Sequence, residues 1–289
     1  MFDTDTMTSV FHIPAKARIN NRKKTFASAI ICLCILLLVA VSGLLLMNVA
    51  TTTDLSIKNL SPCASHIFGT DQLGRDMFAR TISGLSISIC IGLLSAIVSA
   101  FIALFLGVAA ALGGKKVDAV VSWLTDLMMG IPHIILLILI SFALGKGFIG
   151  VTVGVAITHW PSLCRVIRAE VLQVKNSNYV AMAQQMGMGK IKIAIRHIFP
   201  AVFPQFLVGL ILLFPHAILH EAAITFLGFG LPPEMPAIGV ILSESMNYLS
   251  SGMWWLAIFP GISLVLIVLL FDFAGQRVRS FVDPHQAQK

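Results

Sequence analysis

The stretch YVAMAQQMGMGKIKIAIRHIFP, residues 179–200, is a short, basic and amphipathic segment between two long apolar stretches of the chain. Gly187 and Gly189 interrupt it, and Pro200 closes it. The positions that recur there at helical spacing are Val180, Ala183, Met186 and Gly187. Such spacing predicts one compact helix face, on which the small Ala183 and Gly187 permit close backbone approach. We expect this face to bind a partner at the membrane surface; the alternative is an amphipathic helix lying on lipid.

The composition indicates that lipid surrounds the rest of the chain. Of 289 residues, 57% are hydrophobic and 11% are charged, whereas soluble domains have about 45–50% apolar and 25% charged residues. A membrane-spanning helix needs roughly 20 apolar residues. Stretches of that length lie near residues 26–48, 86–112, 118–144, 148–170, 201–227 and 253–275. We therefore expect an all-α integral membrane protein with six transmembrane helices.

These stretches divide the chain into five parts. They are an N-terminal segment 1–25, a first anchor helix 26–48, an outer segment 49–85, a core 86–275 of five transmembrane helices with an inner connection 177–200, and a tail 276–289. The apolar run of the first helix is too long for a secretory signal and no small-residue cleavage site follows it, so an uncleaved anchor is expected.

The distribution of Lys and Arg predicts the orientation. Of the 20 such residues, 16 fall on the side of the two termini and of residues 177–200. Because cytoplasmic loops are enriched in Lys and Arg, both termini are expected in the cytoplasm. This asymmetry accounts for the net charge of +7, so no nucleic-acid partner is required. The five cysteines form no CxxC pair and are interpreted as small core residues.

A second motif lies in the outer segment, where HIFGTDQLGRD covers residues 66–76. Its motif residues are Gly69, Thr70, Asp71, Gly74, Arg75 and Asp76. Thr70 or Asp71 is suited to cap a helix leading into the second span. Arg75 and Asp76 are suited to pair with a partner subunit, and a local ion pair within the chain is the alternative. His66 is interpreted as structural.

The pattern of residues 66–76 resembles the outer segment of peptide and nickel permease subunits of ABC importers. Residues 179–200 resemble the coupling motif of the same permeases, with Ala181 in place of the usual Glu and His197 in place of an apolar residue. The run FLGFG–PP–P–G, followed by WW, FPG and VDP, is also similar to that family. By this resemblance the ATPase-coupling residues are Ala181, Ala183, Gly187, Gly189, His197 and Pro200.

The resemblance implies a type I ABC importer permease in a bacterial inner membrane. It further implies four kinds of contact: a second homologous permease subunit, two cytoplasmic ATPase subunits, an extracytoplasmic substrate-binding protein and membrane lipid. The sequence has no Gly-x-x-x-x-Gly-Lys-Ser/Thr element for nucleotide phosphates. We therefore expect no cofactor on this chain, no enzymatic activity of its own, and ATP and Mg on the partner subunits.

Ionisable residues within the predicted spans indicate a substrate pathway, because their insertion costs about 2.5–3.5 kcal/mol each. These residues are Asp126, His133, His159, His216, His220 and Glu221. Asp126 and His133 are seven apart and are expected to share a helix face, whereas Glu221 is expected to face away from His220.

His216 and His220 are four residues apart, a spacing that suits nickel, cobalt or zinc. Nickel or a related metal, as a small chelate, is therefore the first prediction for the cargo, and a di- or oligopeptide is the alternative. Histidines that only hydrogen-bond between helices are a third interpretation. An ion-coupled secondary transporter would use the same groups as a relay but should show related halves, and the sequence has no such repeat. A membrane hydrolase lacks a complete set of catalytic residues, since no second histidine completes the His-Glu-x-x-His pattern at His220.

Overall fold

The computed structural model describes residues 16–282, and for residues 16–26, 29, 190 and 280–282 it describes the backbone alone. The predicted segment before residue 16 and the tail beyond residue 282 lie outside the described residues. The α-helices are α1 (Lys16–Leu45), α2 (Met47–Thr51), α3 (Met77–Leu112), α4 (Lys115–Gly130), α5 (His133–Ala143), α6 (Gly147–Lys175), α7 (Asn178–Gln185), α8 (Lys190–Ile193), α9 (Phe199–Phe226), α10 (Ile238–Leu249) and α11 (Trp255–Val282). The expected all-α architecture is confirmed for this part of the chain.

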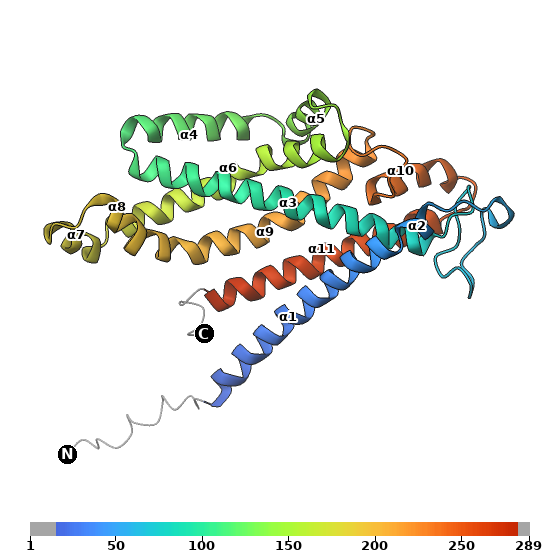
Figure 1. The fold of residues 1–289 in the computed structure, drawn as a ribbon, viewed down its shortest axis with the longest axis horizontal. Coiled ribbons are helices and arrows are strands. Elements are labelled where there is room, and N and C mark those ends of the chain that lie inside the picture. The colour runs from blue at the N-terminus through green and yellow to red at the C-terminus, as the bar shows by residue number, and fades with distance from the viewer. Residues whose placement is uncertain (1–15, 283–289) are drawn as a thin grey trace, which may run out of the picture.

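The long helices lie roughly side by side, with α3 near the centre of the bundle (Figure 1). α3 contacts α1, α6, α9 and α11. The short α7 and α8 lie at one end of the bundle, toward which the first residues of α1 and the last residues of α11 also point (Figure 1). α2 and α10 lie at the opposite end. The connection that contains α7 and α8 is thus on the same side as both described chain ends, as the sequence predicts.

Four described helices are long and apolar enough to cross a membrane: α3, α6, the run Ile191–Phe226 that includes α9, and α11. The pair α4 and α5 makes a fifth only if it is counted as one broken span. The apolar part of α1, Ile30–Leu45, is shorter than these. The prediction of six spans is therefore not confirmed, although each expected span coincides with a helix or a helix pair.

The third expected span, 118–144, is not one continuous helix. α4 and α5 are bent by 97° at a short break, where Ile131 has an extended backbone with ψ 135°. The cause is Pro132, because a proline ring disfavours helical geometry in the residue before it. The break means that Asp126 and His133 belong to different helices and do not share a face, which corrects the sequence prediction.

Small residues on α3 allow the neighbouring helices to approach closely. A Cβ atom on Gly107 would lie 2.9 Å from the backbone oxygen of Cys164 in α6, and one on Gly92 would lie 2.6 Å from Ile218 in α9. Ser83 and Ser86 donate hydrogen bonds to the backbone oxygens of Gly43 and Ala40 in α1. Small residues and interhelical hydroxyl bonds are the usual means by which helices associate in lipid.

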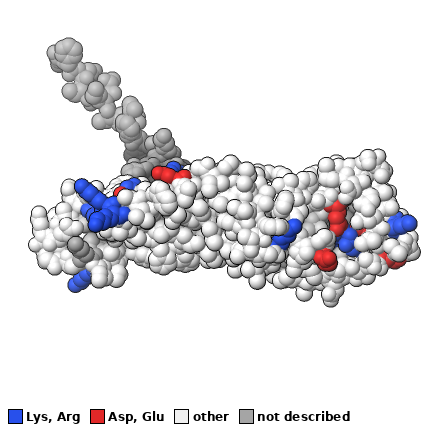
Figure 2. All heavy atoms as spheres, turned by 90° about the horizontal axis from the view of Figure 1, so that it is seen from above, with Lys and Arg blue, Asp and Glu red and all other residues white. Residues whose placement is uncertain are grey.

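Charged side chains are gathered toward the two ends of the molecule. Figure 2 shows a cluster of Lys and Arg at the end that carries α7 and α8, mixed charges at the opposite end, and a broad uncharged band between them. The long helices expose large apolar side chains, such as Leu94 and Phe105 of α3 and Leu266 of α11. An uncharged band with exposed apolar side chains is what a lipid-embedded surface requires.

Candidate functional site

The inner connection between α6 and α9 folds as two short helices and a π-helical turn. α7 ends at Gln185, and Gly187 follows with φ 81°, a left-handed conformation that favours glycine. The backbone N–H of Met188 donates to the oxygen of Ala183 and closes this helix end. The turn Ala194–Ile198 then leads directly into α9.

The surface that this connection exposes differs from the one expected. Val180 and Ala183 are buried against the protein's own core, with exposures of 0% and 6%. Met182 and Met186 point outward instead, with exposures of 62% and 85%. The compact face expected to meet a partner is therefore divided: Val180 and Ala183 hold α7 on the bundle, whereas Met186 and Gly187 are exposed. The exposed methionine side chains form the outer face.

The other predicted coupling residues lie in the same region but in different environments. Ala181, Gly189 and Pro200 are exposed, whereas His197 is half-buried and its Nε2 has no hydrogen-bond partner. Pro200 lies in the first turn of α9, directly after the π-helical turn Ala194–Ile198. A groove next to these residues is lined by Gly189, Ile191, Lys192, Ile195 and Arg196. This groove and the outer methionine face together form what we call the inner surface.

A cavity of about 590 Å³ lies between the α4–α5 break, α6 and α9. Its lining is Met128, Met129, Gly130, Ile131, Pro132, His133, Thr158, His159, Pro161, Ser162, Leu213, His216 and His220. No carboxylate is among these lining residues. The break itself lines the cavity through Gly130, Ile131 and Pro132, so the bend contributes to its shape.

Three histidines from three different helices meet at this cavity. His133 is the first residue of α5, His159 lies in α6, and His220 lies in α9. One nitrogen from each ring lies within 4.8 Å of the others, and the rings meet edge to face at centroid distances of 4.5, 4.5 and 4.9 Å. We refer to these three residues as the histidine cluster. The sequence analysis named all three residues but did not predict that they meet.

The histidine cluster shares His220 with the His216–His220 pair that the sequence predicts. His216 is exposed at the cavity wall, and its backbone oxygen accepts a hydrogen bond from Nδ1 of His220. The structure brings His220 together with His133 and His159, and His216 lines the same cavity. The role of His216 in metal binding stays a prediction.

The two acidic residues of the predicted pathway lie away from the histidine cluster. Asp126 is exposed and accepts a hydrogen bond from Arg165 at 2.5 Å. Glu221 is fully buried and accepts a hydrogen bond from Thr225 through Oε1, while its Oε2 and the nearby Oγ of Ser88 have no partner. The expectation that Glu221 faces away from His220 agrees with this geometry. Neither carboxylate lines the cavity.

Comparison with known proteins identifies the family to which the chain belongs. Residues 103–284 match the family of binding-protein-dependent transport system inner membrane components. The chain belongs to this permease family.

Named relatives of the permease come from Bacillus subtilis. The chain is 29% identical to the dipeptide transport system permease protein DppC over 92% of this chain and 83% of that protein. It is 30% identical to the oligopeptide transport system permease protein OppC over 93% of this chain and 88% of that protein. The MetNI methionine ABC transporter has the same fold, with a TM-score of 0.60 at 20% identity over 72% of this chain and 98% of that chain. The type I ABC importer permease fold is thereby confirmed, as is the predicted resemblance to permeases of the peptide class.

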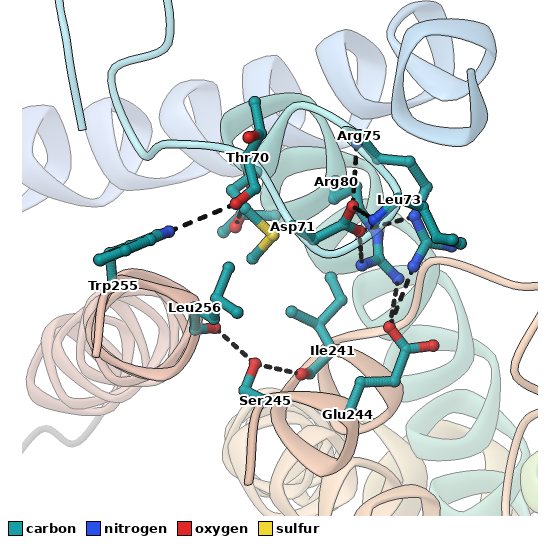
Figure 3. A network of polar contacts seen from close by, with 12 residues as sticks. Thr70, Asp71, Leu73, Arg75, Arg80, Ile241, Glu244, Ser245, Trp255 and Leu256 are labelled. Atoms are coloured by element: carbon teal, nitrogen blue, oxygen red, sulfur yellow. Dashed lines mark hydrogen bonds and ion pairs between the residues drawn. The ribbon is translucent and has the colours of Figure 1, made fainter. Parts of the chain in front are cut away.

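The outer motif of the permease forms a buried ion-pair network at the end of the bundle opposite α7 (Figure 3). Asp71 accepts hydrogen bonds from the backbone N–H groups of Leu73 and Arg75 at 2.9 Å each. It also accepts from Nε of Arg75 and from the guanidinium of Arg80, both at 2.6 Å. The two guanidinium groups reach on to Glu244 of α10 at 3.2 and 3.0 Å. We call Asp71, Arg75, Arg80 and Glu244 the outer network.

The outer network corrects two expectations. The residue that caps α3 is Asp76, whose Oδ1 accepts from the N–H of Ala79 at 2.8 Å, and neither Thr70 nor Asp71 has this role. Arg75 and Asp76 find partners within the chain, since Asp76 pairs with Nδ1 of His66 at 2.7 Å. The interpretation of this motif as a local ion pair, and of His66 as structural, agrees with the geometry.

The other motif residues hold the outer segment in a folded loop. Gly69 and Gly74 both have φ 72°, and the hydroxyl of Thr70 donates to the oxygen of Ile57 while accepting from the N–H of Leu60. The backbone oxygen of Thr70 accepts from the indole of Trp255 at 3.4 Å. These contacts tie the loop to the start of α11, so the motif stabilises the outer end of the permease.

The sequence analysis missed the ion pair that ties α4 to α6. Both Nε and Nη2 of Arg168 contact the carboxylate of Asp118, at 2.5 and 2.6 Å. The two residues are 50 positions apart in the sequence. There, Arg168 is one of the 16 Lys and Arg residues that indicate the cytoplasmic side. A bidentate pair of this kind restrains orientation as well as distance, and it holds the first turn of α4 against α6 despite the break at Pro132.

Proposed function

We propose that this chain is a transmembrane permease subunit of an ATP-driven importer whose cargo is a di- or oligopeptide. The observation that carries the proposal is the similarity over more than nine tenths of the chain to permeases named for dipeptide and oligopeptide transport. The cavity of about 590 Å³ is of a size that suits a small molecule. The cargo that the sequence analysis placed second is thus the better supported one.

In this proposal the inner surface contacts cytoplasmic ATPase subunits. Met182, Met186, Ile191 and Ile195 expose apolar side chains at the end of the molecule that also carries Lys192 and Arg196. An exposed apolar patch rimmed by charge is typical of a protein interface, and Lys and Arg are typical of the cytoplasmic side. Both chain ends then lie in the cytoplasm, the protein is a multi-pass component of a bacterial inner membrane, and two ATPase subunits supply ATP hydrolysis with Mg.

The proposal also includes a second permease subunit and a binding protein, which the cavity and the outer network can accommodate. The cavity lies between the α4–α5 break, α6 and α9, and a second, homologous permease subunit would complete the pathway beside it. The outer network shapes the end of the molecule at which an extracytoplasmic binding protein would deliver cargo. Permeases work by exposing such a site alternately to the two sides of the membrane.

A transition metal, carried as a small chelate, is the second candidate for the cargo. One observation favours it: the histidine cluster lies on the wall of the cavity. Nickel as the cargo has no support from the names of the relatives, which concern peptides. The cavity would have to recognise either a di- or oligopeptide or a metal chelate, and uptake measurements with each cargo distinguish these two classes.

The test is uptake into proteoliposomes that contain the permease, its partner permease and the ATPase subunits, with the binding protein outside. We expect ATP inside the vesicles to drive accumulation of a labelled dipeptide, and a non-hydrolysable ATP analogue to abolish it. Accumulation driven by a proton or sodium gradient without ATP would overturn the proposal in favour of a secondary transporter. Accumulation of labelled nickel but of no dipeptide would replace the peptide by the metal.

A further inference from the structure

Hydrogen bonds fix the tautomer of two of the three rings in the histidine cluster, in which Nε2 of His159 also faces Nδ1 of His220 at 3.4 Å. Nδ1 of His159 lies 2.8 Å from the backbone oxygen of Val155, and Nδ1 of His220 lies 2.8 Å from that of His216. A carbonyl oxygen only accepts, so each Nδ1 carries the proton and each Nε2 has a lone pair. A backbone carbonyl on the far ring nitrogen is the arrangement that orients metal-ligating histidines in proteins.

The third ring has a polar atom without any partner. Nε2 of His133 is buried and makes no hydrogen bond within the described residues. A buried polar group left unpaired costs about 1–3 kcal/mol, and in a lipid-embedded part of the molecule an apolar side chain would avoid that cost. The ring lies 4.5 Å from those of both His159 and His220, so this unpaired group belongs to the same cluster.

From these observations we propose that His133, His159 and His220 bind one divalent transition-metal ion at the cavity wall, with at least one coordination position left open to the cavity. Three imidazole ligands suit nickel, cobalt, copper and zinc, whereas magnesium and calcium require oxygen ligands. The absence of carboxylates from the cavity lining agrees with this choice. The proposal deepens the proposed function, on which it rests for its role in transport, by naming a metal-bearing peptide or a metal chelate as the cargo class.

The distances permit binding after small side-chain movements. At metal–nitrogen distances of about 2.0–2.1 Å, tetrahedral ligand atoms lie about 3.3 Å apart, compared with at most 4.8 Å between the three nitrogens of the cluster. Two of the ligands come from the long helices α6 and α9, and the third begins α5 directly after the break at Pro132. The proposal requires His133 to move toward the other two rings, and the break next to it is the place at which α5 can rotate.

The test is direct metal binding to the purified complex of the permease with its partner subunits, carrying a tag without histidine. We compare Ni²⁺ binding by calorimetry in the wild type and in His133→Asn, His159→Gln and His220→Gln. We expect loss of one ligand to weaken the site that the wild type shows by about tenfold or more. Mg²⁺ should not bind to this site in any of the complexes.

The matched control is His216→Gln, which removes an exposed histidine of the same cavity outside the cluster. The proposal predicts unchanged Ni²⁺ affinity for this variant, whereas a His216–His220 site would lose its affinity and leave the His133 and His159 variants unaffected. That second pattern, or a wild-type complex without the site, overturns the proposal.

A measurement on the wild type does not depend on whether the variants fold. Cu²⁺ bound to the complex should show hyperfine coupling to three imidazole nitrogens in pulsed paramagnetic resonance. Coupling to two nitrogens or fewer overturns the three-histidine site. Dipeptide uptake is measured on the same preparation, so a complex that transports dipeptide but binds no metal refutes this site while the proposed function stands.

Discussion

The outer network provides the sharpest prediction for stability, because its charges are buried and asymmetrically placed. Asp71 and Arg80 are 1% and 2% exposed, whereas Glu244 has a side-chain exposure of 25%. Asp71→Asn keeps an oxygen for the backbone N–H groups of Leu73 and Arg75 but removes the charge that faces Arg80. Loss of one partner of a buried ion pair costs about 3–5 kcal/mol. Since Glu244 still contacts Arg80 at 3.0 Å, we expect the lower value, about 3 kcal/mol.

The assay is thermal unfolding of the purified complex in detergent. The amount of complex that remains folded after heating is measured by size-exclusion chromatography. A loss of about 3 kcal/mol corresponds to a fall in Tm of roughly 5 °C for a chain of this size. Glu244→Gln should cost only about 1 kcal/mol, since its partly exposed pairs are screened by solvent. The double variant Asp71→Asn with Arg80→Met should unfold at a higher temperature than Asp71→Asn alone, because it removes the uncompensated guanidinium.

Two outcomes would refute this reasoning. One is an unchanged Tm for Asp71→Asn, which would show that Arg80 is not held by the charge of Asp71. The other is an equal loss for Asp71→Asn and Glu244→Gln, which would show that burial does not determine the energy of these pairs.

Two further predictions concern the loop and the α4–α6 contact. Gly74→Ala should destabilise the complex by about 1–3 kcal/mol, because Gly74 has φ 72° and its Cβ would overlap the backbone oxygen of Asp54; Gly228→Ala, with φ 82° but no atom within 4 Å, should cost less, and equal losses of Tm would contradict the steric argument. Asp118→Asn should lower the Tm by less than Asp71→Asn does, because its pair with Arg168 is one third exposed; a thermal melt of Asp118→Asn in an Arg168→Gln background should show almost no added loss, and a full added loss would mean that Asp118 acts through another contact.

The sequence predicted the elements of this fold better than their contacts. The helical nature, the interrupted inner connection and the outer loop follow from local patterns, because apolar length, glycine and proline act on neighbouring residues. The break before α5 carried a local signal in Gly130-Ile131-Pro132 that the apolar length of 118–144 concealed. Pro132 restricts the residue before it regardless of how apolar the flanks are, so this signal was sufficient to divide the span.

The contacts that form the site depend on tertiary packing and could not be predicted from spacing. His133, His159 and His220 are far apart in the chain, and only the packing of α5, α6 and α9 brings them to one cavity. A spacing of four along one helix favoured His216 as the partner of His220, since residue spacing gives information only about contacts within one helix. Ala183 was placed on the outer face for a related reason: a helical period identifies a face but not whether it packs against the protein itself or against a partner.

The central claim is that ATPase subunits act on this permease through the inner surface, and one cross-linking measurement tests it directly. The five natural cysteines are replaced, and a cysteine is placed at Met186, which is 85% exposed beside α7, or at Ile67, which is 63% exposed in the outer segment. The account predicts that Met186→Cys cross-links to an ATPase subunit and is protected from an impermeant maleimide added to intact cells, while Ile67→Cys is labelled from outside and does not cross-link to an ATPase. Labelling of Met186→Cys from outside, or an assembled complex in which it cross-links to no ATPase subunit, would contradict the account.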